Sequence, residues 1–151
     1  MLTYQDFQKA DEALFLKMEE AFNATDAMLH PTSLEKRRRT FAAAVSEDPT
    51  VRGVFCLSEG VPAGYAVLSR GFSTDFGGYV LWVEEIFVDA AFRGQGIGRA
   101  FLEWITKTAA KDCALVRLEV APENPRAAKL YEAMGFQTLA YRQYIRPQAG
   151  A

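Results

Sequence analysis

The sequence predicts a single α/β domain built on a mixed β-sheet, and three observations support this. The chain has 151 residues, half of them hydrophobic, which suits one compact core. Apolar residues recur at helical spacing up to about residue 46, and strand-like segments begin at Val51. Beyond the first strands, strand and helix patterns alternate, an order typical of α/β proteins with partly parallel sheets.

Two helices are expected before the first long strand. Apolar spacing predicts one over about residues 6–22 and another over about residues 32–46. The second starts where Thr32 and Glu35 have the spacing of a capping box. It contains the charge run EKRRR, which we interpret as a solvated helix face. Residues 1–5 form at most a short strand.

The middle of the chain is predicted to form strands. Residues 51–57 and 63–70 form a hairpin through a turn at residues 58–62. The stretch at residues 71–78 is expected to be a loop. Residues 79–88 follow as a buried strand with two adjacent glutamates in its centre.

The last third of the chain predicts two helices and two more strand segments. The first helix begins near Ile97, and its core-facing stripe is Ile97, Ala100, Phe101, Trp104, Ile105 and Thr108. Residues 114–120 then form a strand. Asn124 and Pro125 provide the N-cap and first-turn proline of a helix that ends at Gly135. The tail, residues 136–145, is expected to be a last strand or a hairpin.

Charge and composition exclude several classes of function. A formal net charge of −2 provides no general attraction to nucleic acid, so any anion must be bound locally. Neither a membrane span nor a secretory signal is recognisable, and we expect a cytosolic protein without membrane contact. His30 is the only histidine, and Cys56 and Cys113 lie far apart in sequence. We therefore expect no metal site, no Ser–His–Asp triad and two buried free thiols.

Three glycines, at positions 94, 96 and 98, lie between Arg93 and Arg99 where a helix begins. The first amides of a helix lack intrahelical partners, and the helix dipole attracts anions to them. Glycines allow a phosphate to approach the backbone, and the arginines add charge-assisted hydrogen bonds. This segment predicts a site for a cofactor with a diphosphate.

Two common phosphate motifs do not fit this segment. The dinucleotide pattern GxGxxG requires glycine where Arg99 or Phe101 stands, and the P-loop requires a Gly-Lys-Ser/Thr sequence that is missing. The pattern that remains is R-x-x-G-x-G, formed by Arg93, Gly96 and Gly98. A nucleotide-binding module is therefore disfavoured.

The context of this pattern resembles a known family. The stretches VEEIFVDAAFRGQGIGRAFLEW (Val83–Trp104) and LEVAPENPRAAKLYEAMGF (Leu118–Phe136) look like the GNAT superfamily of acetyl-CoA-dependent N-acetyltransferases. The resemblance is close from about Tyr79 to Phe136. It implies a single GNAT-like domain over residues 1–151, with helices flanking a mixed sheet whose two central strands splay apart. The family usually opens with a clear strand, and its early helices vary, which leaves the acceptor substrate open.

The resemblance also implies where acetyl-CoA binds. Its pantetheine arm pairs with the main chain of the splayed strand and contacts an asparagine, and its diphosphate lies on the glycine-segment amides. The cofactor-binding residues that the resemblance implies are Ile86, Phe87, Val88, Arg93, Gly94, Gln95, Gly96, Ile97, Gly98, Arg99 and Asn124.

Acetyl transfer to an amine requires loss of a proton from the amine and stabilisation of the leaving thiolate. An amine with a pKa of ~10.4 is only about 0.04% neutral at pH 7, which corresponds to roughly 4.6 kcal/mol. Glu84 is our first candidate for the base, and Glu85 is the alternative. Strand alternation directs them to opposite faces unless a bulge changes the count. Tyr131, on the last helix, is the candidate acid or hydrogen-bond donor to the thiolate.

The acceptor is less defined. Residues 73–79 and the two glutamates offer acidic and aromatic groups that suit a cation. The resemblance is nearest to diamine, polyamine and other small-amine acetyltransferases, so we expect a small primary amine that attacks directly in a ternary complex. A protein or peptide amino group, an aminoglycoside, an amino acid and a non-catalytic acetyl-CoA sensor remain alternatives. The resemblance is also compatible with a homodimer.

Overall fold

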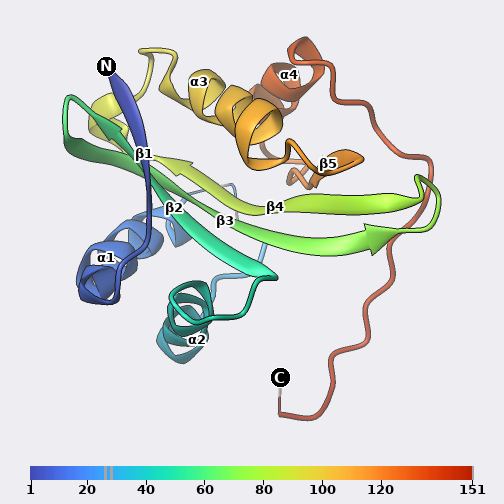
Figure 1. The fold of residues 1–151 in the computed structure, drawn as a ribbon, viewed down its shortest axis with the longest axis horizontal. Helices are drawn as coiled ribbons and strands as arrows, with labels where there is room; N and C mark the ends of the chain where they lie inside the picture. Colours follow the sequence, from blue (N-terminus) through green and yellow to red (C-terminus); the bar gives the residue numbers. More distant parts are fainter. Residues whose placement is uncertain (26, 28, 151) are drawn as a thin grey trace.

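A computed structural model describes residues 1–25, 27 and 29–150. Within these residues one sheet has the strand order β1-β2-β3-β4-β5 (Figure 1). Its strands are β1 (Leu2–Asp6), β2 (Val51–Ser58), β3 (Val61–Ser73), β4 (Gly78–Val88) and β5 (Leu115–Leu118). Neighbouring strands are antiparallel except β5, which is parallel to β4. The predicted mixed sheet is confirmed.

Helices cover both faces of the sheet. They are η1 (Lys9–Asp11), α1 (Glu12–Asn23), α2 (Leu34–Ala44), η2 (Ala90–Phe92), α3 (Ile97–Trp104), η3 (Ile105–Ala109) and α4 (Pro125–Ala133). Figure 1 shows α1 and α2 on one face and α3 and α4 on the other. Among the described residues, no helix combines the length and apolar character that a membrane span needs.

Each face has its own hydrophobic core. The α1/α2 face is mostly aromatic, with Phe7, Phe15, Phe22, Phe41, Phe55, Tyr65 and Phe87 in one cluster. The α3 face is mostly aliphatic, with residues such as Val54, Leu68, Val83, Ile97, Phe101 and Ile105. Because successive strand residues point to opposite faces, both cores draw on alternating positions of the same central strands.

The N-terminal segment differs from the sequence prediction. Residues 2–6 pair antiparallel with β2, and α1 begins at Glu12, so the helix predicted from residue 6 is about a turn and a half too long. The capping prediction for α2 is also wrong. Ser33 is the N-cap, and its hydroxyl accepts from the Lys36 amide at 3.3 Å. Thr32 instead donates its amide to the Asn23 side chain at 2.6 Å, which ties α2 to the end of α1.

The central hairpin is longer than predicted. Residues 71–73 continue β3 and pair with residues 78–80 of β4, which leaves a loop of residues 74–77 where residues 71–78 were expected. Gly77 adopts a φ of +62°, a conformation that glycine reaches at little cost. The strand pairing supplied hydrogen bonds that the local sequence pattern did not reveal.

The helix after the glycine segment follows its predicted stripe for most of its length. Ile97, Phe101 and Ile105 are buried as expected. Thr108 is exposed, because the chain changes to a π-helical turn in which the Ala110 amide donates to the Ile105 carbonyl at 2.9 Å. The wider turn shifts the buried stripe to Ala110.

Candidate active site

A β-bulge lies in the middle of β4. Val67 of β3 is opposite Glu85, while the next residue, Leu68, is opposite Val83, so Glu84 is the extra residue. The bulge reverses the alternation of side chains along β4. Val83 belongs to the α3-side core before the bulge, whereas Phe87, after it, belongs to the α1/α2-side core.

The bulge brings both glutamates to one face. Glu84 accepts a hydrogen bond from the Ser69 hydroxyl at 2.5 Å, and Glu85 accepts one from the Tyr65 hydroxyl at 2.8 Å. Ser69 and Tyr65 are four residues apart on β3 and therefore point to the same face of the sheet. Simple alternation would send the glutamates to opposite faces, and the bulge is the stated exception that places both on one face.

The two carboxylates have different surroundings. Glu84 is exposed to solvent, whereas Glu85 is half-buried. Burial raises the pKa of Glu85, and hydrogen bonds from Tyr65 and Glu19 oppose that rise. Glu84 adds a like charge beside it, which raises the Glu85 pKa further.

The sheet splays directly after the bulge. The β4–β5 ladder runs from Val80 opposite Leu115 to Val83 opposite Leu118, and β4 continues to Val88 after β5 has ended. A cavity of about 350 Å³ opens in the gap. It is lined by Phe22, Ala27, Leu29, Val83, Glu84, Glu85, Ile86, Leu118, Glu119, Val120, Ala121, Asn124, Ala127 and Tyr131. This edge of β4 can pair with an extended ligand.

The glycine segment forms a cradle at the start of α3. Gly94 and Gly96 both have a φ of +76°, and Gly96 is the N-cap of the helix. The first helical main-chain hydrogen bond joins the Ala100 amide to the Gly96 carbonyl at 3.0 Å. The preceding amides of the helix are therefore available to an external acceptor. A Cβ at either glycine would point into open space, so the surface here is bare backbone, as a diphosphate requires.

Arg93 is held next to this cradle. Its Nε donates to the Val88 carbonyl at 3.0 Å, which anchors the guanidinium at the end of β4. The strand edge that would hold a pantetheine arm and the loop that would hold a diphosphate are thus consecutive in space. The residues present fit CoA.

Helix α4 contributes Asn124 and Tyr131 to the wall of the cavity that Glu84 and Glu85 of β4 also line. The Asn124 side chain accepts from the Ala127 amide at 3.2 Å, which confirms its predicted N-cap geometry. Tyr131 lines the cavity, and its ring lies 6.0 Å from that of Phe136. Burial raises the pKa of Tyr131, so its phenol is neutral and can donate a hydrogen bond.

Sequence reasoning missed Glu19 and misjudged Arg37. Glu19 is a buried acid, 1% exposed, on the core stripe of α1 between Met18 and Phe22. The sequence feature that could have identified Glu19 is a charged residue at a core position of an amphipathic helix. Arg37 belongs to the run interpreted as a solvated face, but it is half-buried, and its Nε donates to the Thr32 carbonyl at 2.9 Å.

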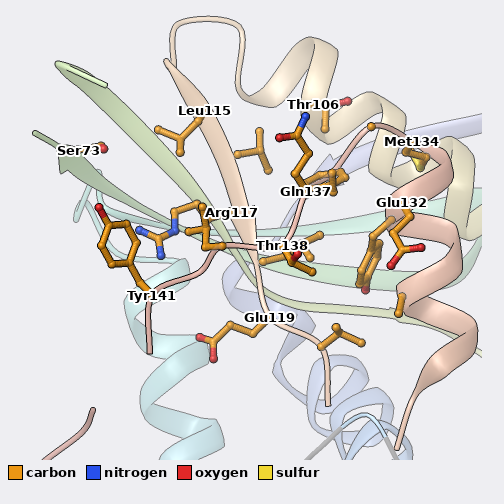
Figure 2. A pocket seen from close by; sticks show the side chains of 18 of the residues that line it. Ser73, Thr106, Leu115, Arg117, Glu119, Glu132, Met134, Gln137, Thr138 and Tyr141 are labelled. Atoms are coloured by element: carbon orange, nitrogen blue, oxygen red, sulfur yellow. The ribbon is translucent and has the colours of Figure 1, made fainter. Parts of the chain in front are cut away.

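The loop expected to help bind the acceptor lies elsewhere. Ser73, Asp75 and Phe76 line a second cavity of about 760 Å³, bounded by β5, α4 and the chain after Phe136. Figure 2 shows it, with Ser73 and Tyr141 on the same side. Along β4, six residues separate the loop from Glu84, roughly 20 Å. The loop does not share a cavity with the carboxylates.

A sheet splayed at a bulge that presents two carboxylates, next to a glycine cradle at a helix N-terminus, defines a class of proteins that transfer an acetyl group from acetyl-CoA. The chain belongs to the acetyltransferase (GNAT) family, whose model matches residues 15–136. The resemblance noted in the sequence is confirmed, and acetyl-CoA is the cofactor that goes with this family.

Two relatives of known name share part of the sequence. The thialysine N-epsilon-acetyltransferase of Bos taurus is 38% identical over 77 residues, 50% of this chain and 45% of the bovine protein. The N-alpha-acetyltransferase RimI of Mycobacterium tuberculosis is 37% identical over 94 residues, 62% of this chain and 57% of the mycobacterial protein. The match thus spans about half the length of these relatives.

Solved structures show the same fold over nearly the whole chain. A possible acetyltransferase from Clostridium difficile 630 has a TM-score of 0.82 at 16% identity, covering 98% of both chains. AAC(6')-Iy, in complex with a bisubstrate analogue of CoA and acetylneamine, has a TM-score of 0.76 at 16% identity, covering 99% of both chains. At these identities the similarity establishes the fold.

Proposed function

We propose that this protein is an N-acetyltransferase that moves the acetyl group of acetyl-CoA directly to a primary amine of a small molecule, with a diamine or polyamine-like acceptor favoured. The observation that carries the proposal is the pair of carboxylates at the β4 bulge, which faces the cavity that Tyr131 also lines. Negative side chains attract an ammonium group and can then accept its proton.

Acetyl-CoA would supply the acetyl group as a thioester. In the proposal, the β4 main chain beyond the bulge pairs with the pantetheine arm, and Asn124 contacts the same arm. The amides of the α3 cradle and the guanidinium groups of Arg93 and Arg99 hold the diphosphate. The residues assigned to this role are Ile86, Phe87, Val88, Arg93, Gly94, Gln95, Gly96, Ile97, Gly98, Arg99 and Asn124.

Glu84 is the proposed base. It is exposed at the bulge, so it can take the ammonium proton directly or through a water and return it to solvent. The Ser69 hydroxyl donates to its Oε1 and limits its rotation. The neutral amine would then attack the thioester carbon, and its nitrogen would form the new carbon–nitrogen bond as the carbon–sulfur bond breaks. The nitrogen would lose its remaining extra proton, and the leaving thiolate would take up a proton to become the free CoA thiol. Tyr131 donates a hydrogen bond to the leaving sulfur.

The experiment is release of free CoA thiol from acetyl-CoA across a panel of monoamines, diamines, polyamines, amino acids and an aminoglycoside. We expect amine-dependent release, with diamines the best acceptors. Glu84→Gln should lower the rate and move the pH optimum upward, because more of the amine must lose its proton to water. An unchanged pH profile would remove Glu84 from the base role.

A protein or peptide amino group is the second candidate acceptor. The similarity to a protein named as an N-alpha-acetyltransferase favours it. The same assay with a set of peptides with free N-termini tests this alternative. Tight acetyl-CoA binding without release of thiol with any amine or peptide would instead support a sensor that binds acetyl-CoA without turnover.

We propose a homodimer in which the chain after Phe136 crosses to a second copy. In the described residues, 137–150 form no strand, so the predicted last strand or hairpin is wrong for an isolated chain. Leu139, Tyr141 and Ile145 are 54%, 74% and 86% exposed, and β5 is the last strand in the sheet order. An apolar segment and an open sheet edge of this kind can satisfy each other across two copies.

Light scattering on the eluted protein tests this arrangement. We expect a dimer for the full chain and a monomer after truncation following Phe136. A monomeric full chain would mean that the tail folds back on its own β5.

The two cysteines bear on the cellular location. Cys56 and Cys113 are free, with Cys56 buried and Cys113 only half-buried rather than buried as predicted. Free thiols suit the reducing cytosol that we propose as the location.

A further inference from the structure

Two acidic side chains meet beneath the active-site cavity. Glu19 of α1 is 1% exposed. Within the described residues, no amide or hydroxyl group donates a hydrogen bond to its Oε2. The carboxyl group of Glu85 is the neighbour that interacts with it by charge and by hydrogen bonding. Glu85 itself reaches the cavity wall. A buried carboxyl group in this position is satisfied only by a proton shared with Glu85 or by a bound cation.

The charges around this pair do not balance. Arg37 from α2 supplies one positive charge, and the Tyr65 hydroxyl from β3 and the Asn23 side chain of α1 supply neutral polar groups. Glu84, on β4, adds a further negative charge next to Glu85. Three carboxyl groups therefore face one guanidinium, so the site needs a bound proton or another cation.

Without a ligand, the proton resides on Glu19. Burial, followed by the charge and hydrogen bond of Glu85, raises the pKa of Glu19 to about 8. Glu19 is therefore the member of the pair that holds the shared proton when no other cation is bound. A cation that enters would remove the need for this proton.

We propose that the Glu19–Glu85 pair binds a second, non-reacting ammonium group of the acceptor, which selects an aliphatic diamine or polyamine over a monoamine. This inference rests on the proposed function and names the residues that select its substrate. The ammonium group contacts Glu85 from the cavity, and Glu19 provides the second negative charge behind it. Phe22, Ala27 and Leu29 offer an apolar wall for the methylene chain of the ligand.

The proton balance of binding follows from this arrangement. The ammonium group brings one positive charge, and Glu19 becomes a carboxylate by releasing its proton to solvent, so the net charge of the site is unchanged. Binding at pH 7 should therefore release a proton from Glu19, because burial and Glu85 hold its pKa well above the ordinary range. The release should become smaller at pH 9, where less of Glu19 is protonated before the ligand binds.

Calorimetric titration measures this release without any turnover. 1,4-Diaminobutane and butylamine are titrated into the full chain with CoA present, in two buffers of different ionisation enthalpy, at pH 7 and pH 9. We expect the diamine to bind at least tenfold more tightly than butylamine at pH 9 and to release more protons at pH 7 than at pH 9. Equal affinities, or no proton release at pH 7, would overturn the assignment.

A matched pair of variants separates this role from a packing role. Glu19→Gln keeps the size and can still donate to Glu85, but it cannot ionise. It should weaken diamine binding at least tenfold, abolish proton release and leave butylamine binding unchanged. Glu35→Gln, at an exposed position of α2, should match the unmodified chain. If Glu19→Gln fails to fold at pH 7, the proton-release measurement on the unmodified chain still decides.

The two proposals fail in different ways. Acetyl transfer to monoamines and diamines alike, with no proton release on binding, would leave the N-acetyltransferase function and remove the ammonium site. Proton-linked diamine binding without acetyl transfer to any amine would leave the ammonium site and remove the proposed function.

Discussion

At the scale of single residues, one inserted residue in β4 decides the chemistry of the site. Glu84 has no opposite residue on β3, so the strand reverses its alternation there and places two carboxylates on one face. Ser69 and Tyr65 then orient the two glutamates separately. One carboxylate stays in contact with solvent, while the other joins the buried acid on α1.

Gly96, the N-cap of α3, is a residue of the proposed cofactor cradle where a side chain would matter. Its φ of +76° costs a non-glycine residue about 1–2 kcal/mol, and an added Cβ would occupy the space proposed for the diphosphate. We expect Gly96→Ala to weaken acetyl-CoA binding at least tenfold, measured by calorimetry. Gly60→Ala is the control, because Gly60 has a similar φ of +78° in the distant β2–β3 turn. Equal acetyl-CoA affinities of the two variants would contradict the assignment of the diphosphate to the glycine cradle.

Tyr131 is expected to act on the leaving sulfur. Its raised pKa keeps the phenol neutral through pH 7–9, so Tyr131→Phe should reduce turnover at saturating acetyl-CoA at least tenfold across that range. Acetyl-CoA affinity should change little. Tyr141→Phe, at a position 74% exposed, serves as the control. Lost affinity with normal saturated turnover would show that Tyr131 only packs.

Glu19 should make folding stability depend on pH. Its pKa rises from 4.5 to about 8 on folding, so the folded chain binds more protons than the unfolded chain between these values. The stability contributed by the protonated group is present below about pH 4.5 and is lost as pH rises to about 8. Thermal denaturation of Glu19→Gln should therefore show a gain in Tm over the unmodified chain that grows from pH 5 to pH 8. A gain independent of pH would refute this account.

At the scale of elements, α3 connects the core to the cofactor cradle. Its N-terminal end carries the glycine segment, and its buried face holds Phe101 at 0% exposure. Trp104, on the same helix, stacks on Tyr4 of β1 with ring centroids 4.4 Å apart, so α3 packs directly on the edge strand β1. Helix and edge strand thus hold each other in place.

Phe101→Ala should destabilise the fold by about 3–5 kcal/mol, because it leaves a cavity in a core that cannot fully collapse. Urea unfolding at equilibrium measures the change in the free energy of unfolding. The m value, the slope of that free energy against urea concentration, should stay the same. Phe72→Ala, at a position 60% exposed on β3, should remain within about 0.5 kcal/mol of the unmodified chain. Similar losses for the two variants would mean that α3 does not organise the core.

At the scale of the whole molecule, the proposed cofactor site draws on three separate elements: the β4 edge, the start of α3 and the start of α4. Bound CoA would contact all three. A ligand that binds only the folded chain stabilises it in proportion to its excess over the dissociation constant.

Acetyl-CoA at 100 times its Kd should add about 2.7 kcal/mol of stability, which corresponds to a rise in Tm of about 5–10 °C for a domain of this size. Differential scanning fluorimetry measures it, with ATP and NAD as ligands that should cause little shift. A larger shift with either nucleotide would indicate a different cofactor.

Much of the fold could be predicted from local patterns. The central strands, α3 with its buried stripe, and α4 with its Asn124 cap follow from apolar spacing and capping chemistry, which depend on neighbouring residues. The start of α1, the length of the hairpin and the tail could not be predicted, because each depends on whether a distant strand edge is available for pairing.

Contiguous residues carry the α/β class, the glycine cradle, the adjacent glutamates and the family resemblance, so these features can be predicted from the sequence. The tertiary structure was needed to show that both glutamates share one face, because a bulge is a mismatch between two strands and is invisible in either one. It also decided that Glu19, 66 residues before Glu85, lies against it. Burial and charge at a site are sums over neighbours in space, and only the folded chain brings those neighbours together.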